Sequence, residues 1–272
     1  MSGTTVPRIR TVEVFRHDRP HETDEAVRLL TDAAREAGVE LVFDADGPVR
    51  ADICLVLGGD GATLRALRKH AGTGVPVFAI NFGRIGFLAT VDREDLPRSI
   101  EIALSGQFEV VSLPALVADG RSSSERFAIN EISFQRRPEI NIAHLSYSLA
   151  GDWVARVPCD GLIAATPAGS TAYSLSVGGP IVAWGVKGFV VNVIAPHALS
   201  SRALVAAPED VLRVVNDGAD PVDVVIDGIR TGELAAGQDC EIKFTPDVVG
   251  LAQLPDSSFY RRFREKLLQL TS

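Results

Sequence analysis

The sequence predicts a protein of two domains: an α/β domain with a mostly parallel sheet, and an all-β sandwich. Short apolar runs alternate with amphipathic helical runs up to about residue 105, which is typical of a doubly wound sheet. Short β-rich runs separated by turn residues follow, up to about residue 255, and this pattern is typical of a sandwich. A basic, amphipathic run closes the chain at 259–270. We expect this last helix to pack back on the first domain, so that residues 1–105 and 256–272 form one domain and residues 106–255 the other.

The elements of the first domain follow from the spacing of its apolar residues. Short runs made mainly of apolar residues predict strands at 12–15, 41–43, 53–57 and 76–80. Apolar residues at helical spacing predict helices at 23–37, 64–70 and 95–104. Gly38 stands directly after the first of these helices, where a glycine commonly ends a helix.

The second domain is expected to consist of short strands. Each predicted run is rich in β-branched or aromatic residues and is bounded by turn residues. These runs lie at 109–111, 115–118, 126–134, 144–149, 153–158, 189–194, 211–215, 223–226 and 240–244.

Composition excludes several classes of protein. The 272-residue chain has 27 Lys and Arg against 35 Asp and Glu, a net charge of −8, which disfavours broad binding to nucleic acid or anionic membranes. No apolar run approaches the roughly 20 residues needed to span a bilayer, and the first ten residues lack the apolar segment of a signal peptide. Three widely spaced cysteines, Cys54, Cys159 and Cys240, form no zinc or disulfide pattern. We therefore expect a cytoplasmic protein with buried, reduced thiols.

The most informative motif is Gly58-Gly59-Asp60-Gly61, between an apolar run and an amphipathic run. Glycines let a backbone approach a bulky anion, and the amides at the start of the following helix favour phosphate. A carboxylate there repels phosphate unless it handles a metal or takes a proton from an attacking hydroxyl. The alternative is a tight turn whose aspartate caps the helix.

Two further motifs are candidates for nucleoside contacts. Phe87 lies in the glycine-containing segment 81–88, at the end of a predicted strand, and its ring could face a base or belong to the core. Asn130 and Glu131 interrupt an apolar strand, a costly place for polar groups unless they are paired. They could bind ribose hydroxyls or an adenine edge, or form a β-bulge or a solvent-facing pair.

The densest segment is 159–180, which is rich in small and hydroxylated residues. This composition allows a ligand to approach closely, and Tyr173 can stack or form a hydrogen bond. Elsewhere, His197 is interpreted as a structural histidine, and Asp227-Gly228 as either a hairpin turn or part of a site.

With these motifs in order, the chain resembles the NAD kinase family, which makes NADP from NAD. The resemblance runs from about residue 12 to the C-terminal helix. It rests on Gly58-Gly59-Asp60-Gly61, on the segment 83–88, on Asn130-Glu131, and on Asp160-Gly161 together with 166–173. Lipid kinases and, loosely, phosphofructokinases share the first motif, whereas the last two separate NAD kinases from both.

The resemblance implies a cleft between the two domains and a phosphoryl transfer to the 2′-hydroxyl of the adenosine ribose of NAD. Asp60 would accept the proton of that hydroxyl. The donor would be ATP, another nucleoside triphosphate or polyphosphate, accompanied by Mg²⁺ or Mn²⁺ whose protein ligands the motifs do not identify. The family also implies a homodimer or homotetramer.

The resemblance also implies a set of binding residues. Phe87 would pack against adenine, and Asn130 and Glu131 would hold the adenosine. Asp160 and the run 171–176 would hold the nicotinamide half, in part from a neighbouring subunit. The residues implied to bind substrate are Gly61, Arg65, Phe87, Asn130, Glu131, His144, Asp160, Thr171, Ala172, Tyr173, Ser174, Leu175 and Ser176.

Two departures from the family pattern leave an alternative open. Ala62 and Ala168 stand where the family usually has a hydroxyl-bearing residue, so a catalytically weak or silent NAD(P)-binding regulatory protein is the second hypothesis. A lipid kinase is the third, and the lack of an apolar membrane-docking stretch argues against it. No Walker-type lysine is present, so we expect metal, glycine amides and arginines such as Arg65 or Arg84 to hold the donor.

Overall fold

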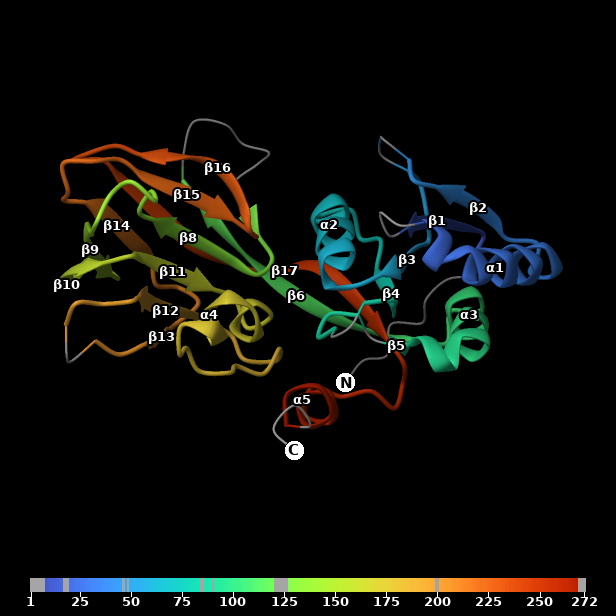
Figure 1. Cartoon of the computed structure of the whole chain (residues 1–272). Helices are drawn as coiled ribbons and strands as arrows, with labels where there is room; N and C mark the ends of the chain where they lie inside the picture. Colours follow the sequence, from blue (N-terminus) through green and yellow to red (C-terminus); the bar gives the residue numbers. More distant parts are fainter. Residues whose placement is uncertain are drawn as a thin grey trace. The chain divides into compact units, whose positions relative to one another are not determined.

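The computed structural model divides into two compact units (Figure 1). The first comprises Met1–Ser112 and Val248–Ser272, and the second comprises Leu113–Asp247. The chain passes between them within two strands, β6 (Glu109–Ala118) and β17 (Asp239–Gln253). The structure describes residues 8–16, 20–45, 47, 49–83, 86–89, 91–119, 127–198 and 201–268.

The first unit contains a parallel sheet. Its strand order is β2-β1-β3-β4, and the C-terminal part of β17 and the short β5 both pair with β4. These strands are β1 (Thr11–Arg16), β2 (Glu40–Phe43), β3 (Ile53–Gly58), β4 (Val77–Asn81) and β5 (Val91–Asp92). The alternating β and α runs of the sequence therefore form the parallel sheet that they predict.

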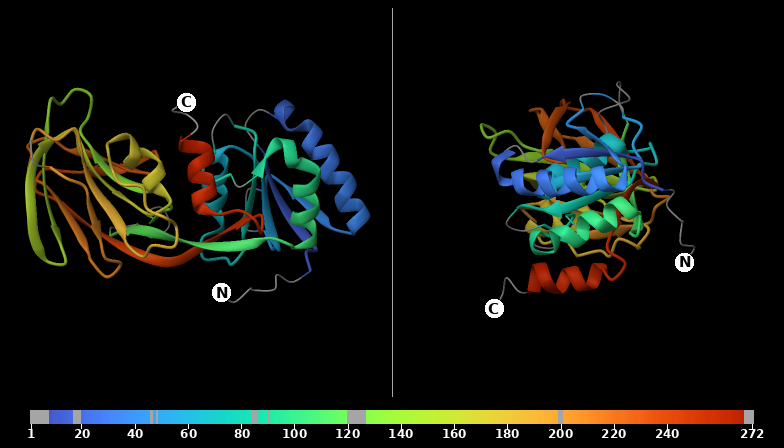
Figure 2. Two further views of the ribbon diagram at one scale, coloured as in Figure 1. Left: turned by 90° about the horizontal axis from the view of Figure 1, so that it is seen from below. Right: turned by 90° about the vertical axis from the view of Figure 1, so that its right-hand side faces the viewer.

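Helices cover both faces of this sheet. Helices α1 and α3 lie side by side (Figures 1 and 2) and share one apolar cluster with residues of β1, β3 and β4. The helical segments of this unit are α1 (Asp24–Ala37), α2 (Asp60–His70), α3 (Leu96–Ser105) and α5 (Phe259–Phe263), with 3-10 turns η1 (Pro20–Glu22) and η2 (Arg93–Asp95). Helix α5 continues as a π-helical turn, η4 (Arg264–Leu268).

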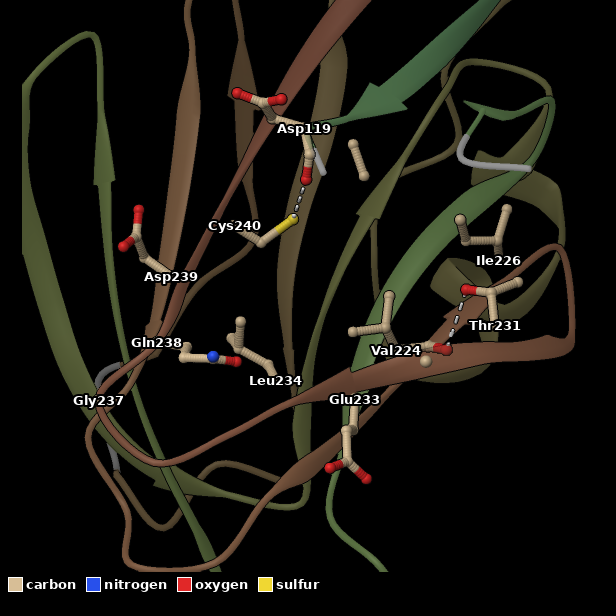
Figure 3. A pocket seen from close by; sticks show the side chains of 12 residues that line it. Asp119, Val224, Ile226, Thr231, Glu233, Leu234, Gly237, Gln238, Asp239 and Cys240 are labelled. Carbon is tan, nitrogen blue, oxygen red and sulfur yellow. Dashed lines mark hydrogen bonds between the residues drawn. The ribbon is translucent and has the colours of Figure 1, made fainter. Parts of the chain in front are cut away.

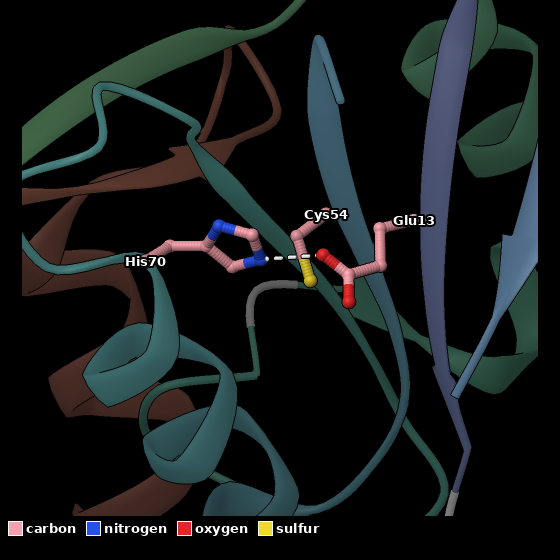
Figure 4. Close-up of side chains that lie close together, drawn as sticks. All are labelled: Glu13, Cys54 and His70. Carbon is pink, nitrogen blue, oxygen red and sulfur yellow. Dashed lines mark ion pairs between the residues drawn. The ribbon is translucent and has the colours of Figure 1, made fainter. Parts of the chain in front are cut away.

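Polar side chains tie α2 to its face of the sheet (Figure 4). Glu13 on β1 and Cys54 on β3 are neighbours in register. The Glu13 carboxylate lies 2.5 Å from Lys69 Nζ and 2.9 Å from His70 Nε2, both at the end of α2. Burial lowers the pKa of His70, and burial together with Glu13 raises the pKa of Cys54.

This cluster also has the composition of a metal site. The ligating atoms of Glu13, Cys54 and His70 lie within 4.8 Å of one another. However, Lys69 already places an ammonium group against the carboxylate and donates to the carbonyl of Ala45 at 2.6 Å. We therefore interpret the cluster as an ion pair between Lys69 and Glu13, with His70 beside the carboxylate, that holds α2.

The second unit is a sandwich of two antiparallel sheets. In one sheet the strands β10, β9, β14 and β17 are neighbours in this order, and β6 pairs with both β17 and β7. The other sheet has the order β13-β12-β11-β8-β15-β16. Side chains from both sheets, among them Phe134, Leu145 and Phe189, form a single apolar cluster. The further elements are β7 (Phe127–Ala128), β8 (Glu131–Gln135), β9 (Ala143–Leu149), β10 (Asp152–Cys159), β11 (Gly161–Ala165), η3 (Gly169–Thr171), α4 (Tyr173–Ser176), β12 (Phe189–Ile194), β13 (Leu204–Ala206), β14 (Leu212–Asn216), β15 (Val222–Ile226) and β16 (Ile229–Leu234).

The structure confirms the predicted fold class, including the return of the C-terminal helix to the first unit, where Arg262 bonds to the carbonyl of Phe87. All three cysteines are buried and none forms a disulfide. Among the residues described, no helix is long and apolar enough to cross a membrane. The sequence predicted the domain boundaries at 105/106 and 255/256. The first lies just before β6 begins and the second just after β17 ends, so both lie within the first unit.

Candidate active site

Two strand-end turns meet at the carboxyl edge of the first unit's sheet. One follows β3 and contains Gly59, and the other follows β4 and contains Gly83. A Cβ atom on Gly83 would lie 3.3 Å from both Gly59 Cα and Asn81 Oδ1, so a side chain at this position would crowd the neighbouring turn. Asn81 Oδ1 also accepts a hydrogen bond from the Gly83 amide at 3.0 Å. Ligands of open α/β sheets bind at this edge.

The carboxylate of Asp60 is fixed by three consecutive backbone amides. It accepts hydrogen bonds from Phe87 N at 2.7 Å, Leu88 N at 2.9 Å and Ala89 N at 3.1 Å. Asp60 is the first residue of α2 and not its cap, so the interpretation of Asp60 as a helix cap is wrong. A carboxylate offers about four acceptor positions, and one therefore remains for a ligand.

The other predicted residues of the first unit differ in exposure. Gly61 and Arg65 are exposed on α2, whereas Ala62 is buried, with 5% of its surface exposed. The ring of Phe87 is 6% exposed and lies 5.5 Å from the ring of Phe259 on α5, edge to face. The ring thus belongs to the core of this unit, and its predicted contact with adenine stays a prediction. Arg84 lies outside the described residues.

In the second unit, a carboxylate again holds three consecutive amides. Asp227 accepts from Ile129 N at 3.0 Å, Asn130 N at 2.8 Å and Glu131 N at 3.1 Å. Asp227 and Gly228 connect β15 to β16, and both have positive φ, as a two-residue type I′ turn requires. Asp227 therefore both makes the turn and shapes the break between β7 and β8.

Asn130 and Glu131 present buried oxygen atoms that have no partner within the described residues. These atoms are Asn130 Oδ1 and Glu131 Oε2. Burial and the charge of Asp227 raise the pKa of Glu131 to about 7, against the opposing effect of a bond from the Tyr173 backbone. Buried polar atoms are almost always paired, so this pair fits a ligand with hydroxyl or amino donors. The interpretation of this pair as facing solvent is wrong.

Close backbone packing sets the shape of the small-residue segment. A Cβ atom on Gly169 would lie 2.0 Å from the carbonyl oxygen of Asn130, so only glycine fits there. Thr166 Oγ1 donates to the carbonyl of Ile129 at 2.6 Å, and Ser170 Oγ bonds to the backbone of Pro167 at 2.7 Å. These hydroxyls thus hold the loop together and are engaged by protein.

The predicted residues 171–176 follow directly on this segment. Thr171 Oγ1 donates to the carbonyl of Ala168 at 3.0 Å, and Ala172, Leu175 and Ser176 are at least partly exposed. Ser174 is fully buried, and its Oγ has no hydrogen-bond partner within the described residues. Burial and the charges of Asp160 and Glu131 raise the pKa of Tyr173, so the tyrosine lies near both carboxylates.

Asp160 has a partner that the sequence analysis missed. Arg136 Nε and Nη2 bind its two oxygens at 2.6 and 3.3 Å, and this bond lowers the pKa of Asp160. Local sequence patterns did not indicate that Arg136 pairs with Asp160, because the two residues are 24 positions apart in the sequence. His144, on β9, is paired in register with Pro158 on β10, whose carbonyl accepts from the backbone amide of His197.

The second unit also contains a cavity of about 480 Å³ (Figure 3). None of the predicted site residues is among the 12 that line it. Two of its three acidic side chains, those of Glu233 and Asp239, are paired with arginines. We therefore do not assign it to the active site.

The α/β unit with its aspartate turn and the sandwich with its buried acceptor pair define a two-domain nucleotide kinase. Residues 13–108 match the ATP-NAD kinase N-terminal domain, and residues 129–252 match the ATP-NAD kinase C-terminal domain. The chain belongs to the NAD kinase family.

Individual relatives are similar in sequence to this chain over most of their length. The chain is 36% identical to the NAD kinase of Symbiobacterium thermophilum over 250 residues, which are 89% of this chain and 88% of that protein. It is 34% identical to the NAD kinase of Mycolicibacterium paratuberculosis over 250 residues, 88% of this chain and 80% of that protein.

Solved structures have the same fold. Yeast NADH kinase in complex with NADH matches with a TM-score of 0.83 at 25% identity, covering 97% of this chain and 89% of that chain. The NAD kinase of Archaeoglobus fulgidus in complex with ATP matches with a TM-score of 0.78 at 26% identity, covering 94% of this chain and 98% of that chain.

Proposed function

We propose that this chain transfers a phosphoryl group from ATP to the 2′-hydroxyl of the adenosine ribose of NAD, giving NADP. The observation that carries the proposal is the Asp60 carboxylate, held by three amides on a glycine turn with one acceptor position left. Phosphoryl transfer needs mainly positioning and charge neutralisation, and a positioned base adds roughly 10²–10⁴-fold. In this role Asp60 bonds to the hydroxyl and takes its proton as the bond to phosphorus forms.

The second unit supplies the contacts to the nucleoside in this proposal. Asn130 Oδ1 and Glu131 Oε2 are buried acceptors without partners in the described chain, and ribose hydroxyls or the adenine amino group would satisfy them. Asp160, Tyr173 and the rest of 171–176, with His144, would bind the nicotinamide half. A homodimer or homotetramer, in which a neighbouring subunit completes this half, is part of the proposal.

We further propose that the donor arrives with a divalent metal. The described residues offer no cage of three ligands at Asp60, whereas Mg²⁺ is typically held by substrate phosphates, water and one or two carboxylates. Such an ion would neutralise phosphate charge, and Gly61 and Arg65 would line the donor side of the turn. Polyphosphate is the alternative donor.

The direct test replaces Asp60 with asparagine. Asp60→Asn should lower the rate of NADP formation by roughly 10²–10⁴-fold, while calorimetry still detects NAD binding and the thermal midpoint shows a folded protein. Asp32→Asn, on the exposed surface of α1, is the matched control and should retain full activity. Wild-type turnover in Asp60→Asn would rule out the role as base, and NAD binding without turnover in the wild type would favour the silent alternative.

A further inference from the structure

The segment Phe87–Ala89 lies between two charged side chains. Its three amides donate to the Asp60 carboxylate. Two of its carbonyls accept from one nitrogen of Arg262: Nη1 lies 2.7 Å from Phe87 O and 3.4 Å from Ala89 O. The peptide group between Phe87 and Leu88 thus connects the two charged side chains, because its amide donates to the proposed base and its carbonyl accepts from the guanidinium on the C-terminal helix.

Arg262 is itself held in place. Only 5% of its surface is exposed, and Nη2 donates to Ser257 Oγ at 3.0 Å. The helix that carries it begins with a side-chain cap, because Ser258 Oγ accepts from the Arg261 amide at 3.1 Å. One turn earlier, Phe259 packs its ring against that of Phe87. Two contacts from α5 therefore fix the segment.

The segment depends on these contacts because it belongs to no helix or strand. Buried backbone groups must find partners, and here side chains from outside the segment provide them. The guanidinium at the Phe87 carbonyl also polarises the peptide group between Phe87 and Leu88, which strengthens the donation of the Leu88 amide to the carboxylate.

We propose that Arg262 is a positioning residue for phosphoryl transfer, which sets the amide cradle of Asp60 through the carbonyls of Phe87 and Ala89. The inference rests on the proposed role of Asp60. It makes α5 part of the catalytic apparatus of the first unit, although none of its residues was predicted to touch substrate. Loss of Arg262 should therefore affect the chemical step and leave the affinity for NAD largely intact.

The kinetic test compares two neighbouring arginines of α5. Arg262→Ala should lower kcat by roughly 10–100-fold, the cost of a small misplacement of a reacting group, with little change in the KM for NAD. Arg261→Ala removes the same side chain from an exposed position and should leave both constants unchanged. Equal effects of the two substitutions, or a rise in KM with kcat unchanged, would overturn the inference.

Rescue separates positioning from general stability. Arg262→Lys keeps the charge and one donor group and should recover part of kcat. Millimolar guanidinium chloride should recover part of kcat in Arg262→Ala but not in Asp60→Asn, and sodium chloride at equal ionic strength should recover none. Failure of both rescues would show that Arg262 acts only on stability.

A structural readout tests the cradle independently of activity. Amide hydrogen exchange at residues 87–89 should be faster in Arg262→Ala than in wild type or Arg261→Ala. Unchanged exchange there would contradict the inference, even in an active enzyme. If the wild type makes no NADP with any donor, the proposed function fails while the exchange measurement still decides whether Arg262 holds the segment.

Discussion

At the scale of single residues, both units contain the same arrangement, in which one aspartate accepts hydrogen bonds from three consecutive backbone amides. Asp60 holds the amides of 87–89, and Asp227 holds those of 129–131. The glycine turn around Asp60 marked it in the sequence as functional. Nothing local marks Asp227 in this way, because its partners lie 96 to 98 residues away. Local spacing therefore predicted a functional role for one aspartate and left the interpretation of the other undecided.

Glu131 should make stability depend on pH. Its pKa is raised from the ordinary 4.5 to about 7, because burial and Asp227 disfavour the ionised form. The unfolded chain ionises first, so the free energy of unfolding should fall as pH rises from about 4.5 to about 7. Glu131→Gln removes this titration, and urea unfolding across that range should show a smaller fall than in wild type.

The control for this experiment is Glu139→Gln, at an exposed position beyond the end of β8. It should follow the wild-type dependence on pH. A fall of the same size in Glu131→Gln would show that other groups cause it.

At the scale of elements, strong apolar patterns predicted most of the structure. The strand expected at 189–194 has the predicted bounds, and the helix expected at 23–37 begins one residue later. The strands β5, β11, β13 and β16 were missed. Strand β11 contains small residues such as Gly161, a composition that is typical of a loop. In the structure Gly161 is buried, and β11 pairs with β12 on one side and β8 on the other. The run 126–134 forms two strands and not one, because Asp227 holds the amides between them.

Helix α2 should depend for its attachment on the carboxylate of Glu13. Glu13→Gln leaves the ammonium of Lys69 without its buried partner, and breaking such a pair costs on the order of 3 kcal/mol. Urea unfolding should show this loss. Glu40→Gln, on the exposed surface of β2, is the control and should change the free energy of unfolding by less than about 0.5 kcal/mol. Equal losses in the two variants would contradict the ion-pair interpretation.

At the scale of the whole molecule, binding of NAD and transfer of phosphate should respond differently to metal removal. The proposed nucleoside contacts are protein atoms of the second unit, whereas the donor is proposed to bring its own cation. EDTA should therefore abolish NADP formation from ATP, and Mg²⁺ or Mn²⁺ should restore it. Calorimetry should find NAD binding unchanged by EDTA. A parallel assay with polyphosphate identifies the donor, and metal-independent turnover with ATP would contradict the proposed role of the cation.

The first unit is assembled from the two ends of the chain, and this arrangement sets an order of events during synthesis on the ribosome. Residues 113–247 emerge complete before the first unit has its last strand, since Leu251 and Ala252 of β17 must still pair with β4. Domains commonly fold in the order in which they are made, but here the middle of the chain can finish first. A chain released early would contain the unit that is proposed to bind the nucleoside, without the arginine that contacts the Asp60 segment.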